Sequence, residues 1–174
     1  MLIPSPSAVA AERRADTRAA EAAAKRVLRE CGVEKPPIDP VAIARKQGVA
    51  VHFVEFTDGR DLSGFYDADE NAIYVNRADS PVRQAFTVAH ELGHKLLHAA
   101  WASSDRYKVF PRDVGANDMD AFEEEATAFA NALLVPTEML AHYAGVASVS
   151  QLADLFLVSP PVIRQRIDSG AGRG

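Results

Sequence analysis

The stretch that decides the fold is SPVRQAFTVAHELGHKLLH, residues 80–98. Its apolar residues recur every three or four positions, the spacing that places them along one face of an α-helix. Ser80 is a residue type that caps helix N-termini, and Pro81 suits the first helical turn, where its missing N–H is not needed. The stretch therefore predicts an amphipathic helix from Pro81 to about His98.

The same helix carries the pattern H-E-x-x-H at residues 90–94. Residues four apart lie on one helical face, so the imidazoles of His90 and His94 can reach one metal ion and Glu91 can reach its bound water. Zinc lowers the pKa of such a water to about 7 and polarises a carbonyl, while the carboxylate transfers the proton. With five histidines in 174 residues, a chance match on a predicted helix is rare. The pattern favours zinc-dependent hydrolysis over a coincidence of core side chains.

A catalytic zinc usually takes three protein ligands and keeps one position for water, so a third donor is needed. Residues from about 118 to 134 predict a second helix, begun by an aspartate cap, and it contains the glutamate triplet 123–125. Helical phasing places Glu123 with the apolar residues that face the core, whereas Glu124 points to solvent. Phasing therefore favours Glu123 as the third ligand and leaves Glu125 as an alternative.

Three stretches extend this pattern: GFY with AIYVN in residues 64–76, RQAFTVAHELGHKLLH in 83–98, and EEEATAFANALLVP in 123–136. Together they resemble the ImmA/IrrE-type metallopeptidases over most of residues 38–168. The resemblance is specific because the two longer motifs occur together in the expected order. It implies a minimal gluzincin-type protease with a zincin-type helical core, in which the Glu that opens the second motif, here Glu123, is the third zinc ligand.

The resemblance also implies a substrate class. Members of the family typically cleave a helix-turn-helix repressor or antitoxin and so relieve repression of phage, mobile-element or stress genes. The expected function is therefore a zinc metalloendopeptidase, although carboxylate ligation also accommodates manganese. The alternative is a non-catalytic regulator that binds a partner protein or DNA, but that role would not need Glu91.

One position departs from the family pattern. Thr127 stands where the family usually has Asn or Asp, four residues after Glu123 on the same helical face. A threonine hydroxyl accepts the N–H of a liganding imidazole more weakly than a carboxylate does. We therefore expect reduced metal affinity or turnover without loss of the site.

Other residues are candidates for the edge of the site. His98 lies four residues after His94, although a histidine at a helix end is more often a cap or surface group. Gly93 costs a helix about 1 kcal/mol relative to alanine, which predicts that another backbone packs closely there. An oxyanion needs a hydrogen-bond donor aimed at it. The candidate donors, among which the sequence does not choose, are Tyr66, Tyr74, Arg106 and Tyr107.

The flanking segments predict an α+β fold. Residues 8–31 indicate a largely exposed helix with an apolar stripe at Val27 and Leu28, and residues 41–47 a short helix after an Asp-Pro cap. Residues 99–118 show no periodicity, and a loop of that length in a compact domain is a candidate lid. Runs rich in β-branched and aromatic residues predict a small antiparallel sheet packed on the helices. These runs are residues 49–56, 62–66 and 72–75.

The C-terminal segment looks like a helix-turn-helix, in which Ser159 caps the second helix. Arg164, Gln165 and Arg166 could contact DNA from that helix, but a chain of net charge −5 neutralises few phosphates. We expect weak DNA binding and docking of a protein partner instead. The expected parts are an N-terminal helix in 1–37, a metallopeptidase core in 38–136 and a C-terminal helical segment in 137–174.

Composition indicates a soluble globular protein, with 48% hydrophobic and 25% charged residues. The single cysteine, Cys31, cannot form an internal disulfide and suits a reducing compartment. The first residues lack the pattern of a signal peptide, and no apolar run approaches the ~20 residues that span a bilayer. We therefore expect a cytoplasmic protein without a membrane partner.

Overall fold

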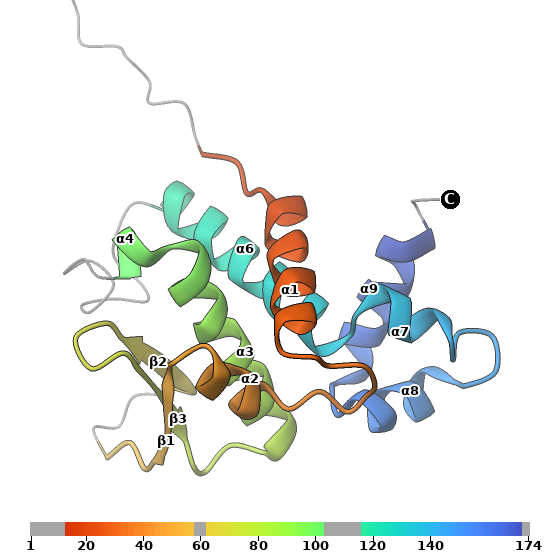
Figure 1. Ribbon diagram of the computed structural model, residues 1–174, viewed down its shortest axis with the longest axis horizontal. Helices are drawn as coiled ribbons and strands as arrows, with labels where there is room; N and C mark the ends of the chain where they lie inside the picture. Colours follow the sequence, from red (N-terminus) through yellow and green to blue (C-terminus); the bar gives the residue numbers. More distant parts are fainter. Residues whose placement is uncertain (1–12, 58–61, 103–115, 172–174) are drawn as a thin grey trace, which may run out of the picture.

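The computed structural model describes residues 13–57, 62–102 and 116–171. The helices are α1 (Thr17–Glu30), α2 (Pro40–Lys46), α3 (Pro81–Leu97), α4 (Ala99–Ala102), α6 (Ala116–Leu134), α7 (Thr137–Ala141), α8 (Val149–Phe156) and α9 (Pro160–Ala171). The strands are β1 (Ala50–Val54), β2 (Gly64–Asp67) and β3 (Ala72–Asn76). The sheet lies at one end of the molecule and α7, α8 and α9 at the other, with α1, α3 and α6 between them (Figure 1). The fold is α+β, as the sequence predicts.

The sheet is mixed, so the prediction of an antiparallel sheet is wrong. Its order is β1-β3-β2, with β2 antiparallel and β1 parallel to β3. A short turn joins β2 to β3, so these two strands pair as a hairpin. The end of β1 at Val54 and the start of β2 at Gly64 both lie near Asn76, at the same end of β3. The connection 55–63 exceeds the about two to five residues of a hairpin loop, which allows β3 to lie between β1 and β2.

Helix α3 is the central element, and its predicted limits are confirmed. The Ser80 hydroxyl accepts the N–H of Arg83, Pro81 begins the helix, and His98 follows its last residue. The helix packs against α2, β2 and β3 and against α6. The predicted close approach at Gly93 is confirmed, because the backbone of Ala126 on α6 lies against it.

Helix α1 begins at Thr17, so the predicted start near residue 8 is wrong for residues 13–16, which are described and not helical. The helix begins at Thr17 because Asp16 caps it: the Asp16 side chain accepts the N–H of Ala19. The helix packs along α6. Its buried face is broader than predicted, since three alanines are buried beside Val27 and Leu28.

The segment between α3 and α6 is partly ordered as helix. Ala99–Ala102 form α4, which corrects the expectation of an unstructured loop there. Helix α6 starts at Ala116, slightly before the predicted aspartate caps, and ends at Leu134 as predicted. The rest of the predicted lid, residues 103–115, lies outside the described residues.

The C-terminal residues form three short helices, as predicted. Arg166 is buried, and its guanidinium donates hydrogen bonds to the Val135 carbonyl and the Thr137 hydroxyl and contacts the Glu21 carboxylate. The prediction that Arg166 could face DNA is therefore wrong. This arginine instead ties α9 to α1 and to the start of α7. The three-part domain division stays a prediction.

Within the described residues, no helix is both long and apolar enough to cross a bilayer.

Candidate metal centre

Helices α3 and α6 bring three donor side chains to one point. His90 Nε2 lies 3.1 Å from His94 Nε2 and 3.1 Å from Glu123 Oε2, and His94 Nε2 lies 3.2 Å from Glu123 Oε1. Zinc binds imidazole nitrogen and carboxylate oxygen at about 2.0–2.2 Å, which separates two donors of a tetrahedral site by about 3.3 Å. The observed distances match that separation, so the three side chains fit a divalent metal without rearrangement.

The three donors differ in exposure. The His94 side chain is 2% exposed, that of His90 15% and that of Glu123 50%. The phasing argument is therefore wrong about Glu123, which lies at the solvent-facing rim, and the buried carboxylate of the triplet is Glu125. The site is closed on the His94 side and open on the Glu123 side, where water and a substrate could enter.

Charges around the site favour ligation by an ionised carboxylate. Burial alone would raise the pKa of Glu123, but hydrogen bonds from His90 and His94 hold it well below its usual range. For His90, burial alone would lower the pKa, but the hydrogen bond with Glu123 and the charges of Glu91 and Glu123 raise it. Glu123 therefore stays ionised at neutral pH.

Glu91 occupies the position next to the first histidine ligand. Its side chain is buried in α3, and its charge acts on His90. Hydrolysis needs a proton acceptor for the attacking water beside the metal position, and a buried carboxylate next to His90 is suitably placed for that role. Glu91 is not among the three clustered donors, consistent with a role other than ligation.

A second layer of polar side chains lies behind His94. His94 Nδ1 lies 3.1 Å from His98 Nδ1, and His98 Nε2 lies 2.7 Å from Glu125 Oε2. His98 is 4% exposed, so its interpretation as a surface group is wrong. The sequence indicated His98 as a candidate for the edge of the site, because four residues separate it from His94 on one helical face, but did not predict its contact with Glu125.

The chain matches the model of the IrrE N-terminal-like domain, a peptidase family, over residues 44–168. It belongs to this family. The chain is 35% identical over 85 residues to the radiation response metalloprotease IrrE of Deinococcus radiodurans, an alignment that covers 37% of this chain and 26% of that protein. The chain thus spans about a quarter of the length of this curated relative.

The fold also occurs in a solved structure. A Mycobacterium tuberculosis transcriptional regulator superposes with a TM-score of 0.62 at 21% identity, over 86% of this chain and 46% of that one. At this identity the likeness shows the fold alone.

In this member of the IrrE N-terminal-like family, Thr127 lies beside the site, as predicted. Its hydroxyl is 3.5 Å from His90 Nδ1, at the outer limit for a hydrogen bond. The hydrogen-bond partners of the two histidines therefore differ. His94 contacts His98, which in turn contacts Glu125, whereas the contact of His90 Nδ1 with Thr127 is long.

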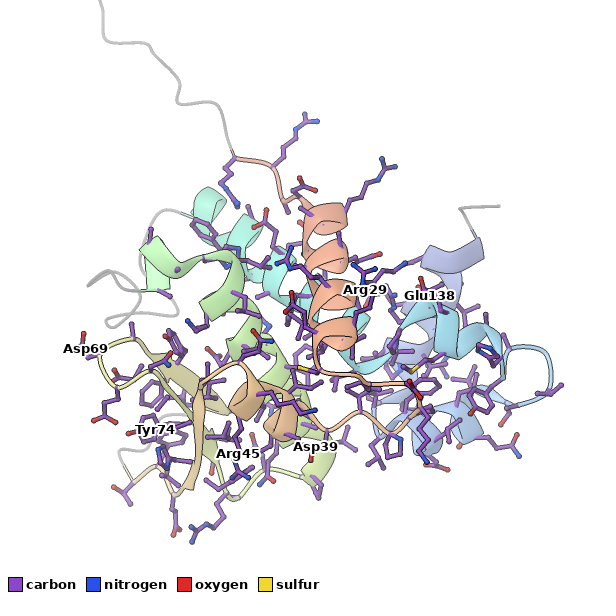
Figure 2. All side chains as sticks on the ribbon, viewed as in Figure 1. Arg29, Asp39, Arg45, Asp69, Tyr74 and Glu138 are labelled. Atoms are coloured by element: carbon purple, nitrogen blue, oxygen red, sulfur yellow. The ribbon has the colours of Figure 1, made fainter. Side chains whose placement is uncertain are left out.

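The two candidate oxyanion donors that the structure describes, Tyr66 and Tyr74, have hydrogen-bond partners at the β2–β3 turn. The Tyr66 hydroxyl donates to Asn71 Oδ1, and the Tyr74 hydroxyl pairs with Glu70 at the β2–β3 turn. Tyr74 lies on the sheet side of the molecule (Figure 2). The other two candidates, Arg106 and Tyr107, lie outside the described residues.

Proposed function

We propose that this chain is a zinc-dependent endopeptidase of the gluzincin type with a zincin-type helical core. The observation that supports this proposal best is the convergence of His90, His94 and Glu123 at the separations of a tetrahedral site. The buried Glu91 beside them adds the proton-transfer group that hydrolysis requires. Binding of a structural ion would not need Glu91.

The roles of the side chains follow from their positions. A zinc ion held by the three donors would polarise the scissile carbonyl and lower the pKa of a bound water to about 7. Glu91 accepts a proton from the attacking water and returns it to the leaving amine. The half-exposed Glu123 leaves the rim of the site accessible to a peptide. Two imidazoles and one carboxylate suit zinc, and manganese is the second choice.

For the substrate, we propose a helix-turn-helix repressor or antitoxin whose cleavage relieves repression, in a stress response. Support comes from the family and from the Deinococcus relative, a radiation response metalloprotease. The proposed location is the cytoplasm, where such regulators act. The C-terminal pair α8 and α9, which we propose to be helix-turn-helix-like, would then dock protein.

The alternative function is a non-catalytic regulator that binds a protein or DNA. The fold is compatible with it, since the M. tuberculosis structure that shares the fold is a transcriptional regulator. The net charge of −5 and the burial of Arg166 argue against direct DNA binding. Few exposed cations remain on α9 to neutralise phosphates.

The test combines metal content with cleavage. Protein purified without chelator should carry about one zinc per chain, and His90→Ala should lose it. Glu91→Gln should keep the metal and the fold, while cleavage of the substrate, sought first in the product of the neighbouring gene, falls at least about 10²-fold. A wild-type protein that binds no transition metal on titration, or a Glu91→Gln variant that cleaves at the wild-type rate, would rule out the proposal.

A further inference from the structure

Three buried side chains form a continuous line of polar contacts that leads away from the metal centre. His94 Nδ1 contacts His98 Nδ1 at 3.1 Å, and His98 Nε2 contacts Glu125 Oε2 at 2.7 Å. Each of these residues is at most 4% exposed. Because bulk water hardly reaches these side chains, their positions depend on their contacts with one another and with the protein around them.

The contacts on its two sides fix the orientation of the His94 ring. Its Nδ1 lies against His98 Nδ1, while its Nε2 lies 3.1 Å from His90 Nε2 and 3.2 Å from Glu123 Oε1. The other ring nitrogen of His98 contacts Glu125, so the position of the His98 ring depends on that carboxylate. Together, Glu125 and His98 keep Nε2 of His94 turned toward the other two donors.

Residues before α1 hold Glu125 in place. Arg13 Nη2 donates to Glu125 Oε2 at 2.9 Å, and the backbone N–H of Asp16 donates to Oε1 at 2.7 Å. The Arg13 guanidinium lies 4.4 Å from the centre of the Phe122 ring, and the centre of that ring lies 4.6 Å from the centre of the His98 ring. The segment 13–16 therefore fixes both members of the pair, although it lies outside the region matched by the family model.

We propose that Glu125 and His98 are positioning residues that hold the His94 ring with Nε2 toward His90 and Glu123, and that the segment 13–16 holds them there. This inference rests on the proposed metal site, in which His94 Nε2 is a ligand. Second-layer partners of liganding histidines typically change metal affinity by about 10–100-fold. The N-terminal segment is thereby part of the metal centre.

The first test reads the His94 ring in the metal-free protein. Two-bond ¹H–¹⁵N correlation spectra resolve the signals of its two ring nitrogens. Glu125→Gln and His98→Phe should shift the Nδ1 signal of His94, whereas Glu124→Gln should leave it unchanged. A His94 Nδ1 signal that is the same in all three variants as in the wild type would overturn the inference, whether or not the protein binds metal.

The second test uses two measurements. Competition with a chromophoric chelator gives the zinc affinity, and the visible spectrum of the cobalt-substituted protein reports the geometry of the ligands. Glu125→Gln and His98→Phe should weaken zinc binding about 10–100-fold and change the cobalt spectrum. His98→Asn keeps an acceptor near the position of Nδ1 and should recover part of the loss. Arg13→Gln, a change at a partly exposed side chain, should give a smaller loss in the same direction.

The matched control is Glu124→Gln, an exposed neighbour on the same helix, which should bind zinc like the wild type. Thermal unfolding of each metal-free variant separates loss of affinity from loss of fold; if Glu125→Gln does not fold, His98→Asn and Arg13→Gln carry the comparison. Wild-type zinc affinity and cobalt spectra in the folded variants would overturn this inference and leave the proposed function standing. Failure of the wild type to bind any metal would instead remove the proposed function.

Discussion

Gly93 of α3 faces the backbone of Ala126 on α6: a Cβ added at Gly93 would lie 3.3 Å from the Ala126 Cα and 3.1 Å from Cδ1 of the buried Phe129. The two ligand-bearing helices can approach this closely because position 93 has no side chain. One glycine therefore sets the separation between His94, next to it in sequence, and Glu123, less than one turn before Ala126.

Gly93→Ala should destabilise the protein and weaken metal binding. Alanine gains up to about 1 kcal/mol in helix propensity, but overpacking a tight contact costs about 1–3 kcal/mol, and a backbone neighbour cannot move aside as a flexible side chain can. We expect a lower Tm in the metal-free protein and a lower zinc affinity. An unchanged Tm together with unchanged affinity would show that α3 and α6 adjust without cost.

Thr127→Asp should strengthen zinc binding. The wild-type hydroxyl lies 3.5 Å from His90 Nδ1, whereas a carboxylate there would accept the imidazole N–H with its charge and raise the basicity of the ligand. An increase of about tenfold is expected, the lower end of the range for second-layer partners. Chelator competition measures it, with Thr127→Val as the matched variant, which should lose little because the existing contact is long. A Thr127→Asp affinity at or below wild type would contradict this prediction.

Arg166→Ala should destabilise the C-terminal helices, so its main effect should be on the free energy of unfolding and not on the binding of a partner. The substitution removes hydrogen bonds to Val135 and Thr137 and the contact with Glu21, and breaking a buried ionic contact typically costs about 3–5 kcal/mol. Arg164→Ala, at an exposed position of the same helix, should stay within about 0.5 kcal/mol of wild type. Urea unfolding of both variants checks this, and equal midpoints would show that Arg166 is not structural.

Zinc affinity should fall as the pH drops below neutral. Metal ligands must be deprotonated, and the hydrogen bond with Glu123 and the nearby carboxylate charges, acting against burial, raise the pKa of His90 above 6.5. Protons therefore compete for His90 at a higher pH than for an ordinary histidine, while Glu123 stays ionised because its pKa is lowered. Chelator competition in a series of buffers should show a loss of about tenfold per pH unit once His90 is protonated. A constant affinity through this range would exclude His90 as a ligand.

Several features were predictable because they depend on neighbours in sequence. The limits of α2 and α3 follow from Asp39-Pro40 and Ser80-Pro81, where capping side chains reach N–H groups within three residues. The shared face of His90 and His94 follows from the helical repeat alone. The glycine at 93 predicted a close backbone contact because a helix accepts that cost only where packing needs it.

Other features required the folded chain. Phasing chose Glu123 as a core-facing residue, but the side chain is half exposed, and Glu125 is buried because Arg13 and Asp16, more than a hundred residues away in sequence, cover it. The position of β3 between β1 and β2 depends on how residues 55–63 connect the outer strands. The burial of Arg166 likewise depends on Glu21 and Val135 from other elements.

The sequence by itself determined the limits of α2 and α3 and the residue types that face the candidate metal site, since periodicity and capping act within one or two turns. Only the tertiary structure decided which carboxylate lies at the rim and which lies behind His94. The helical repeat specifies the face on which a side chain lies but carries no information about which distant segment packs against that face.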